Sequence, residues 1–436
     1  MQSSAVQITN KLRLAPMNPT PQRARLSANL VFFTYGLLIG TYLPYLPFIK
    51  DRFGVGEGVF SFGLFFAALG ALLSLPLAPW ILKMIGSRKA ILYSSTAFLL
   101  IVSALIAAPD IRIFFLLFFM LGLSISSWEV SANSQASVIE DQLGKPVMSS
   151  IHGFWSLGTF VGSASMGGWL QLEIDGRWLV WLFVALGLVG LTYVFQGLLR
   201  RHQIKAESGD ESTPLRLRYL LYPPLLVIAL FQIAGFMLEG SFQDWGAFLI
   251  RELVLGHGAE IVPERLWAEL PADEAEARRR AAVAGALVLA SFTGTMTIGR
   301  LLGDPFVARF GRVGTLQIGG VLGVVGIALT TMGGLGWNTF VGFALVGLGT
   351  ANVIPQVIKT ADTTPGLPPG VAISAITAMG FVAFLGGPVA LGFAGESFTF
   401  RTTFMVLGIL PIFILVAAAP VLGWFRQGEA AKKPSA

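Results

Sequence analysis

Twelve apolar stretches of about 20 residues, separated by short polar loops, run through this chain. Each stretch is long enough to cross the hydrocarbon core of a bilayer as a helix. Inside hydrocarbon every backbone N–H needs an internal partner, so spans of this length are helices rather than strands. The sequence therefore predicts an all-α integral membrane protein, with spans at residues 27–49, 58–82, 90–108, 113–135, 147–170, 178–199, 219–249, 280–303, 313–333, 338–358, 370–394 and 402–425.

The composition agrees, since 54% of the residues are hydrophobic and only 12% are charged, against about 25% charged in a typical soluble protein. The chain has no cysteine, which excludes disulfides, thiolate metal sites and thiol catalysis. Its three histidines, His152, His202 and His257, are scattered, and no nucleophile–base–acid group or metal cluster is evident. We expect no enzyme activity, no metal and no cofactor.

Basic residues indicate the orientation. The segment before the first span has no apolar core, so we expect no cleavable signal peptide. With the N-terminus inside, the inner segments hold 19 Lys and Arg and the outer segments hold 10. We therefore expect a monomeric multi-pass protein of the bacterial inner membrane with both termini in the cytoplasm. The net charge of +6 then reflects orientation and not nucleic-acid binding.

The spans divide into two sets of six. The segment 200–218 follows the sixth span and is the one long polar loop on the inner side. Basic glycine turns follow spans two and eight, at 83–89 and 309–312, about half the chain apart. Such 6+6 symmetry is known in transporters, whose substrate sites lie near the midplane between the halves. The expected division is an N-terminal tail (1–26), an N-terminal bundle (27–199), a central loop (200–218), a C-terminal bundle (219–425) and a C-terminal tail (426–436).

One outer segment, 251–280, is an insertion of about 30 residues rich in acidic and basic side chains. It resembles a short amphipathic helix over the outer mouth. A solvated spacer is the alternative interpretation.

Polar side chains inside the spans are the best functional indications, because charges at bilayer depth are costly and usually face a bundle interior. They recur every three or four residues, which places them on one face of each helix. Glycine, serine and threonine in such stripes are commonly packing contacts, but packing does not require a carboxylate. The stripes are Gly122, Ser126, Glu129 and Asn133; His152, Ser156, Thr159 and Ser163; Gln232, Gly235, Glu239 and Gln243, with Asp244 just off that face; and Gly349, Asn352, Gln356 and Lys359.

These stripes predict a site for a polar solute. Low dielectric raises the pKa of a carboxyl group in general, which suits proton-coupled transport. No basic residue lies at midspan among the stripes, which favours neutral polyhydroxylated or cationic solutes. Aromatic rings are available to stack on a sugar face or a cation, although aromatic residues are also common anchors in membrane proteins. The candidate solute-binding residues are Glu129, Asn133, His152, Trp155, Tyr42, Asn352 and Gln356, and the candidate proton-coupling residues are Glu129, Glu239 and Asp244.

Charges near the inner helix ends are candidates for gating. Arg300 lies near an inner helix end, from which it can reach water or pair with Asp304. Lys83 and Arg88 lie in the basic turn after span two, and Arg309 lies in the turn after span eight. We assign all five to structure or gating.

With these twelve spans, the central loop and the two basic turns, the whole chain resembles the major facilitator superfamily. Gly122, Glu129 and Asn133 resemble the Glu-Thr-x-x-Asn-Pro signature of its fucose/glucose/galactose proton symporters. The segments 133–135, 144–146, 152–158 and 239–245 resemble bacterial permeases grouped with the rhizopine-transport, MosC-like proteins. The resemblance implies that Glu129 and Asn133 contact solute and that Glu129 is coupled to protonation.

The chain departs from that pattern at three places. Leu43 stands where the sugar symporters carry an acid in span one, so Glu239 or Asp244 takes over the proton or the coupling differs. Ser134 replaces the proline of the signature. Lys83 replaces the usual aspartate after span two, which puts the gating salt bridge of the first half in doubt.

The sequence thus predicts a proton-coupled symporter of a small polar solute, such as a sugar or polyol derivative, that works by alternating access. A proton-driven exporter of drugs or metabolites is the alternative, because the same carboxylates and a phenylalanine-rich cavity would accept amphipathic cations.

Overall fold

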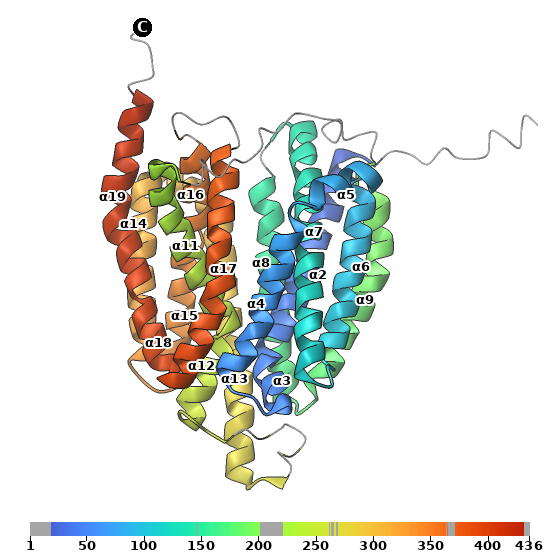
Figure 1. The fold of residues 1–436 in the computed structure, drawn as a ribbon, viewed down its shortest axis with the longest axis vertical. Helices are drawn as coiled ribbons and strands as arrows, with labels where there is room; N and C mark the ends of the chain where they lie inside the picture. The colour runs from blue at the N-terminus through green and yellow to red at the C-terminus, as the bar shows by residue number, and fades with distance from the viewer. Residues whose placement is uncertain are drawn as a thin grey trace, which may run out of the picture.

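The computed structural model describes residues 19–145, 147–200, 221–260, 262, 266, 269–362, 364 and 371–430. The described part of the chain is helical, as predicted, and its helices form two groups side by side (Figure 1). Ten helices in this part are long and apolar enough to cross a membrane. The helices α8 and α17 fill the places of the other two expected spans.

The N-terminal group holds the first six spans. Its first span bends at a 3-10 turn, η1, where Pro44 supplies no backbone N–H. The sixth span begins at the N-cap Asp175, which accepts the backbone N–H of Arg177. In order, the group contains α2 (Pro21–Tyr42), η1 (Leu43–Tyr45), α3 (Leu46–Phe53), α4 (Glu57–Ser74), α5 (Ala78–Ile85), α6 (Ser87–Leu105), α7 (Ile111–Leu143), α8 (Met148–Gln171) and α9 (Gly176–Gly197).

The C-terminal group holds the other six spans, and several of them are broken. The seventh breaks at Trp245 and the tenth at the turn formed by Ala351 and Asn352. In α14 Gly311 leaves the helical conformation at φ 70°, which separates a short inner helix from the ninth span. The group contains α11 (Pro223–Asp244), α12 (Gly246–Leu255), α13 (Ala272–Leu301), α14 (Gly303–Thr331), α15 (Trp337–Thr350), α16 (Val353–Asp362), α17 (Val371–Ser397), α18 (Phe400–Leu407) and α19 (Ile409–Ala430).

The main helix pairings of the first group have counterparts six spans later. Helix α2 packs on α8, and α11 packs on α17. Helix α4 packs on α7, and α13 packs on α15. Between the groups, α8 meets α13 and α4 meets α17, which is again a symmetric exchange of the second and fifth spans of each half. The internal repeat that was only faint in the two basic turns is therefore clear in the packing.

The insertion 251–280 differs from the expected amphipathic helix. Residues 251–255 are the end of α12, and residues 272–280 are the first turns of α13. Both charged ends of the segment thus lengthen membrane helices. On α13, an i, i+4 ion pair between Arg278 and Glu274 stabilises the added turns. Glu264 and Trp267 lie outside the described residues, as does most of the expected central loop 200–218.

Small residues allow α2 and α8 to approach closely. A Cβ atom added at Gly36 would overlap the backbone carbonyl of Trp155, and one added at Gly158 would overlap that of Phe33. Backbone atoms cannot move aside as a flexible side chain can. The pair therefore packs through glycines, as is common between membrane helices.

We expect Gly36→Ala to destabilise the protein by about 1–3 kcal/mol, because the added methyl group must push α2 and α8 apart. At Gly190 on α9, the matched position, an added Cβ atom would meet no neighbouring helix within 4 Å among the described residues. Gly190→Ala should be neutral or slightly stabilising, because alanine is the better helix former. Thermal unfolding of both variants in the same detergent tests this, and equal melting temperatures would contradict it.

Candidate functional site

An ion pair of the C-terminal group lies where the two groups of helices meet. Both carboxylate oxygens of Glu239, on α11, accept hydrogen bonds from Arg300 Nη2, on α13, at 3.1 Å. Arg300 Nη1 also donates to Ser156 Oγ of α8 at 2.8 Å, so the arginine joins the C-terminal group to the N-terminal group. The side chains of Arg300 and Glu239 are only 16% and 12% exposed. A charge pair this deep needs such complementary contacts to offset its desolvation.

This geometry corrects two expectations about Arg300. The arginine pairs with Glu239, which is 61 residues away in the sequence, and not with Asp304. Asp304 is exposed at the start of α14. The polar stripe of the seventh span therefore has a basic partner, Arg300 of the eighth span, which the sequence pattern did not indicate. Gln243 Nε2 completes the arrangement by donating to Glu239 Oε1 at 3.1 Å.

Glu129 lies on α7 about midway between its ends and is exposed. Leu116 and Met120 are exposed on the opposite side of the helix, as expected of a face turned to lipid. The side of α7 that carries Glu129 also carries Asn133, one turn further on. The carboxylate therefore faces the interior of the protein, and in the described part of the chain it has neither a hydrogen bond nor an ion pair.

Asn133 and His152, two of the candidate solute-binding residues, lie in contact. Asn133 Oδ1 and His152 Nε2 are 3.2 Å apart and link α7 to α8. The imidazole ring lies edge-on against Phe32, which in turn contacts Trp128. Four aromatic rings, those of Phe32, Trp128, Tyr35 and Phe98, continue from this point into the N-terminal group.

The other candidates occupy varied positions. Trp155 is partly buried, three residues beyond His152 on α8. Tyr42 is buried at the end of α2 but lies close enough to Asp244 for an electrostatic interaction. Asp244 is the last residue of α11, at the break before Trp245. These two residues are together, but they lie in a different layer from Asn133 and His152.

Asn352 and Gln356 are built into the broken tenth span. Asn352 Nδ2 donates to the carbonyl of Gly299 at 3.0 Å, so this amide supports the end of α13 next to Arg300. The backbone N–H of Gln356 donates to the carbonyl of Asn352 at 3.2 Å. Asn352 thus has a positioning contact, whereas the partly buried Gln356 side chain keeps its place as a candidate for solute contact.

The predicted gating residues do not come together in one group. Arg88 Nε donates to the carbonyl of Phe195 at 2.9 Å, and its guanidinium lies over that ring, so Arg88 ties α6 to α9 within one half. Lys83 is exposed on α5. Arg309 is exposed in α14 beside Phe310, and Asp304 is exposed at the beginning of the same helix.

Polar contacts that the sequence analysis missed join the halves at the end where α3, α12 and the start of α13 lie (Figure 1). Arg251 Nη1 donates to Asp51 Oδ1 at 2.6 Å. The fully buried Lys50 lies between the carboxylates of Asp51 and Glu57, at 3.6 and 2.6 Å. The Gly58 N–H donates to Glu396 Oε2 at 2.7 Å. The sequence feature that could have indicated these contacts is the charged pair Lys50 and Asp51 directly after an apolar span.

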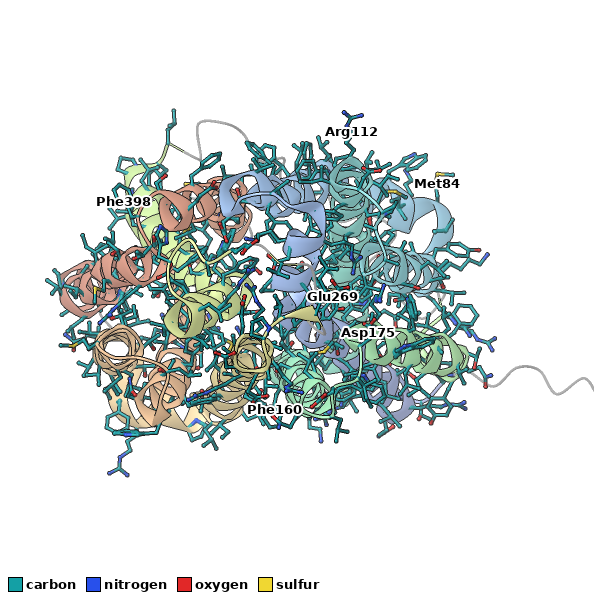
Figure 2. The ribbon with its side chains drawn as sticks, turned by 90° about the horizontal axis from the view of Figure 1, so that it is seen from below. Met84, Arg112, Phe160, Asp175, Glu269 and Phe398 are labelled. Carbon is teal, nitrogen blue, oxygen red and sulfur yellow. The ribbon has the colours of Figure 1, made fainter. Side chains whose placement is uncertain are left out.

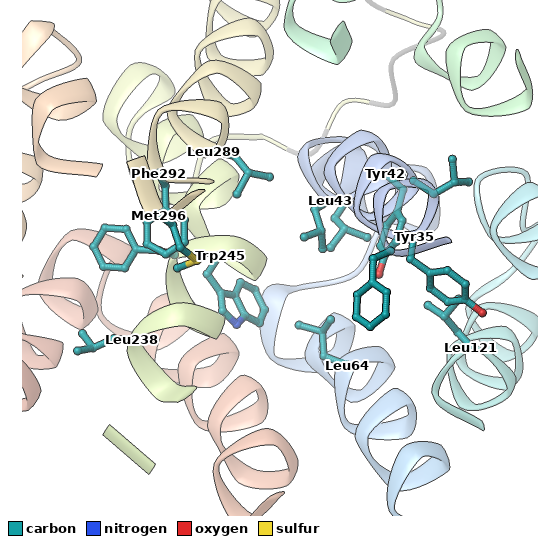
Figure 3. Packing of buried hydrophobic residues seen from close by; sticks show 14 of the residues in the cluster. Tyr35, Tyr42, Leu43, Leu64, Leu121, Leu238, Trp245, Leu289, Phe292 and Met296 are labelled. Atoms are coloured by element: carbon teal, nitrogen blue, oxygen red, sulfur yellow. The ribbon is translucent and has the colours of Figure 1, made fainter. Parts of the chain in front are cut away.

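Aromatic side chains close the same end. Trp245 is fully buried against Phe248 and Phe400, with ring centroids 5.0 and 5.4 Å away. Phe248 reaches Phe60 of the other half at 5.9 Å. Figure 3 shows the side chain of Trp245 on one side of the seam and Leu43 and Leu64 on the other. The two halves are thus sealed together at this end by apolar and ionic contacts.

Known proteins share this architecture. The family model of the Major Facilitator Superfamily matches residues 28–263. The uncharacterized transporter y4wD of Sinorhizobium fredii is 30% identical over 399 residues, which cover 90% of this chain and 96% of that protein. Membrane protein MosC of Rhizobium meliloti is 24% identical over 405 residues, which cover 93% of this chain and 91% of that protein.

Solved structures agree on the fold. The crystal structure of the nucleoside transporter NupG has a TM-score of 0.66 at 13% identity, and the match covers 92% of this chain and 99% of the other. A bacterial homolog of the human lysosomal transporter Spinster, in an inward-facing and unoccupied conformation, has a TM-score of 0.61 at 14% identity, with 95% and 98% covered. By the family model, which matches more than half of the chain, and by a relative that is 30% identical over 90% of it, this chain belongs to the major facilitator superfamily of membrane transporters.

Proposed function

We propose that the chain is a proton-coupled symporter of a small polar solute, such as a sugar or polyol derivative, and that it works by alternating access between its two halves. The observation that carries the proposal is the Glu239–Arg300–Ser156 group, a largely buried carboxylate and guanidinium where the two halves meet. Packing alone does not require a charge pair buried among membrane helices.

The ion pair supplies a simple coupling step. While Glu239 is ionised, it holds Arg300, and Arg300 also holds Ser156 of the other half. A proton added to a Glu239 carboxylate oxygen removes the negative charge and weakens that pair. Arg300 is then free to leave Ser156 or to bind a polar group of the solute. Protonation and the contact between α8 and α13 are thereby linked.

The solute site lies beside this group. Glu129 offers a carboxylate that has no ion pair among the described residues, and Asn133 with His152 offers amide and imidazole groups that can donate to or accept from hydroxyl groups. Polyhydroxylated solutes need such alternating donors and acceptors. In this structure the halves are sealed at the end that carries Asp51 and Arg251, while Glu129 is exposed. We therefore assign the structure to the inward-facing state of the cycle.

The first experiment identifies the solute. Thermal unfolding of the purified protein is measured across sugars, polyols, amino sugars and lipophilic cations, because a ligand that binds only the folded state raises its stability. Stabilisation by sugars or polyols supports the symporter. Stabilisation confined to lipophilic cations would support the exporter instead.

Replacing Glu239 by Gln should abolish solute accumulation driven by a pH gradient while leaving solute counterflow, because the amide cannot cycle a proton. Proteoliposomes loaded with the solute from the thermal screen provide both measurements. Glu269→Gln, the same change at an exposed site, is the matched control. Gradient-driven accumulation at the normal level would remove Glu239 from the coupling step.

The same variant leaves Arg300 without its counter-charge, so it should also lose stability, by up to about 3 kcal/mol if desolvation dominates. The double variant Glu239→Gln/Arg300→Gln removes both charges and should recover part of that loss. A double variant that is stable but transports nothing would separate folding from coupling.

Replacing Glu129 by Gln should leave the fold intact, because this carboxylate has no ion pair in the described part of the chain to break. The thermal stabilisation by the solute and the proton-driven accumulation should both be lost. Undiminished uphill transport by Glu129→Gln would show that Glu129 has no part in coupling.

Cross-linking tests alternating access directly, since the chain has no cysteine of its own. In the variant Asp51→Cys/Arg251→Cys a short bifunctional thiol reagent should join α3 to α12 and hold that end closed. Net transport should stop while solute binding persists. Each single cysteine variant, treated in the same way, should keep transporting. Full transport by the cross-linked protein would contradict the assignment of this end as a gate.

A further inference from the structure

The second span, α4, begins without a capping side chain of its own at the end where the halves are sealed together, the closed end. Its N-cap residue is Gly56, and the acid of its first turn, Glu57, is held by Lys50 at 2.6 Å. The first N–H groups of a helix have no partner inside the helix, and together they carry a partial positive charge. The beginning of α4 therefore needs an acceptor from another element.

That acceptor comes from the other half of the protein. Glu396 lies in the last turn of α17, and its Oε2 atom accepts the backbone N–H of Gly58 at 2.7 Å. In the described part of the chain Glu396 has no other hydrogen bond or ion pair. Figure 2 looks onto this end of the molecule, with Phe398, two residues after Glu396, labelled in the C-terminal half. An acid in the last turn is unfavourable for its own helix, whereas it is favourable at the beginning of α4.

Glycines make room for this carboxylate. A Cβ atom added at Gly56 would overlap Glu396 Oε1, and one added at Gly58 would lie 2.9 Å from Glu396 Oε2. One turn earlier on α17, a Cβ atom added at Gly392 would overlap Ser61 of α4. Helix α17 thus lies directly on the first turns of α4, and the Glu396 carboxylate occupies the space that side chains would otherwise fill.

The symmetric seam has a glutamate at the corresponding place. Helices α8 and α13 meet between the halves as α17 and α4 do. Glu173 follows the end of α8 by two residues, and it forms an ion pair with Arg279 near the beginning of α13. In both seams, therefore, a glutamate at the end of a fifth span contacts the beginning of the second span of the other half.

We propose that Glu396 is a positioning residue of the transport cycle, which caps α4 from the other half and thereby favours the closed state of this end. The proposal rests on the alternating access of the proposed function. When the halves separate at this end, the beginning of α4 loses its cap and Glu396 loses its partner. Glu173 acts in the same sense but contributes less, because its side chain is 69% exposed and exposed ion pairs are weak.

Thiol labelling measures the opening of this end, because the chain has no cysteine of its own. Ser61 is fully buried against α17, so a maleimide reacts with Ser61→Cys when α4 and α17 separate. Thr330 is equally buried, but between α14 and α15 of one half, so Thr330→Cys reports unfolding instead. Labelling needs neither solute nor a proton gradient. A negative result would therefore leave the proposed symport standing.

In the Ser61→Cys protein, Glu396→Ala should raise the labelling rate about fivefold, the effect of losing one helix cap. Glu396→Gln should raise it less, because the amide oxygen can still accept the Gly58 N–H although the charge is lost. Both variants should fold, since Glu396 is exposed.

Glu252→Ala is the matched control. The two carboxylate oxygens of Glu252 accept the backbone N–H groups of Phe400 and Arg401 at 2.7 and 2.9 Å, so Glu252 also caps a helix, α18, but within the C-terminal half. This variant should leave the labelling rate of Ser61→Cys unchanged. Three results would overturn the proposal: unchanged labelling of Ser61→Cys in Glu396→Ala, an equal rise in Glu252→Ala, or an equal rise at Thr330→Cys in Glu396→Ala.

Discussion

The ion pair of Arg300 with Glu239 is the interaction on which the centre of this protein depends. A buried guanidinium without its counter-charge is unfavourable by about 3–5 kcal/mol, so the position of α13 relative to α11 is constrained by the need to keep the two charges together. Ser156 extends that constraint to α8 in the other half. One solvation requirement therefore constrains the arrangement of three spans.

That requirement also explains why the structure differs from the sequence-based site. The apolar spans, their helical conformation and the polar face of each helix follow from local periodicity, and the stripes with Glu129, Asn133 and His152 were found in this way. Asp304 was an attractive partner for Arg300 because it lies four residues away. Asp304 lies beyond the end of α13 and is exposed. Glu239 is largely buried on α11, 61 residues before Arg300 in the sequence. Which spans become neighbours cannot be read from the periodicity of either one.

The contacts between Asp51, Arg251 and Lys50 were missed for a related reason. Each residue ends an apolar segment, where charges are expected to reach water. The first span instead continues through η1 into α3, which carries Lys50 and Asp51 into a buried position against α12. Likewise, the charges of the 251–280 insertion suggested a separate surface helix. They belong to the lengthened ends of α12 and α13, where ion pairs one helical turn apart stabilise the added turns.

The two layers of contacts between the halves differ in chemistry, and this difference matters for a cycle of opening and closing. The closed end combines aromatic packing around Trp245 with several charge contacts, so separating the halves there exposes apolar area and ionic groups together. The central layer is joined through Arg300, whose partners Glu239 and Ser156 differ in charge. In the proposed cycle, protonation of Glu239 would act on the central layer, which is separate from the aromatic and ionic contacts of the closed end. Because the seventh and eighth spans carry both the central contacts and residues of the closed end, the proposed action of solute and proton at the centre would be transmitted along these helices to that end.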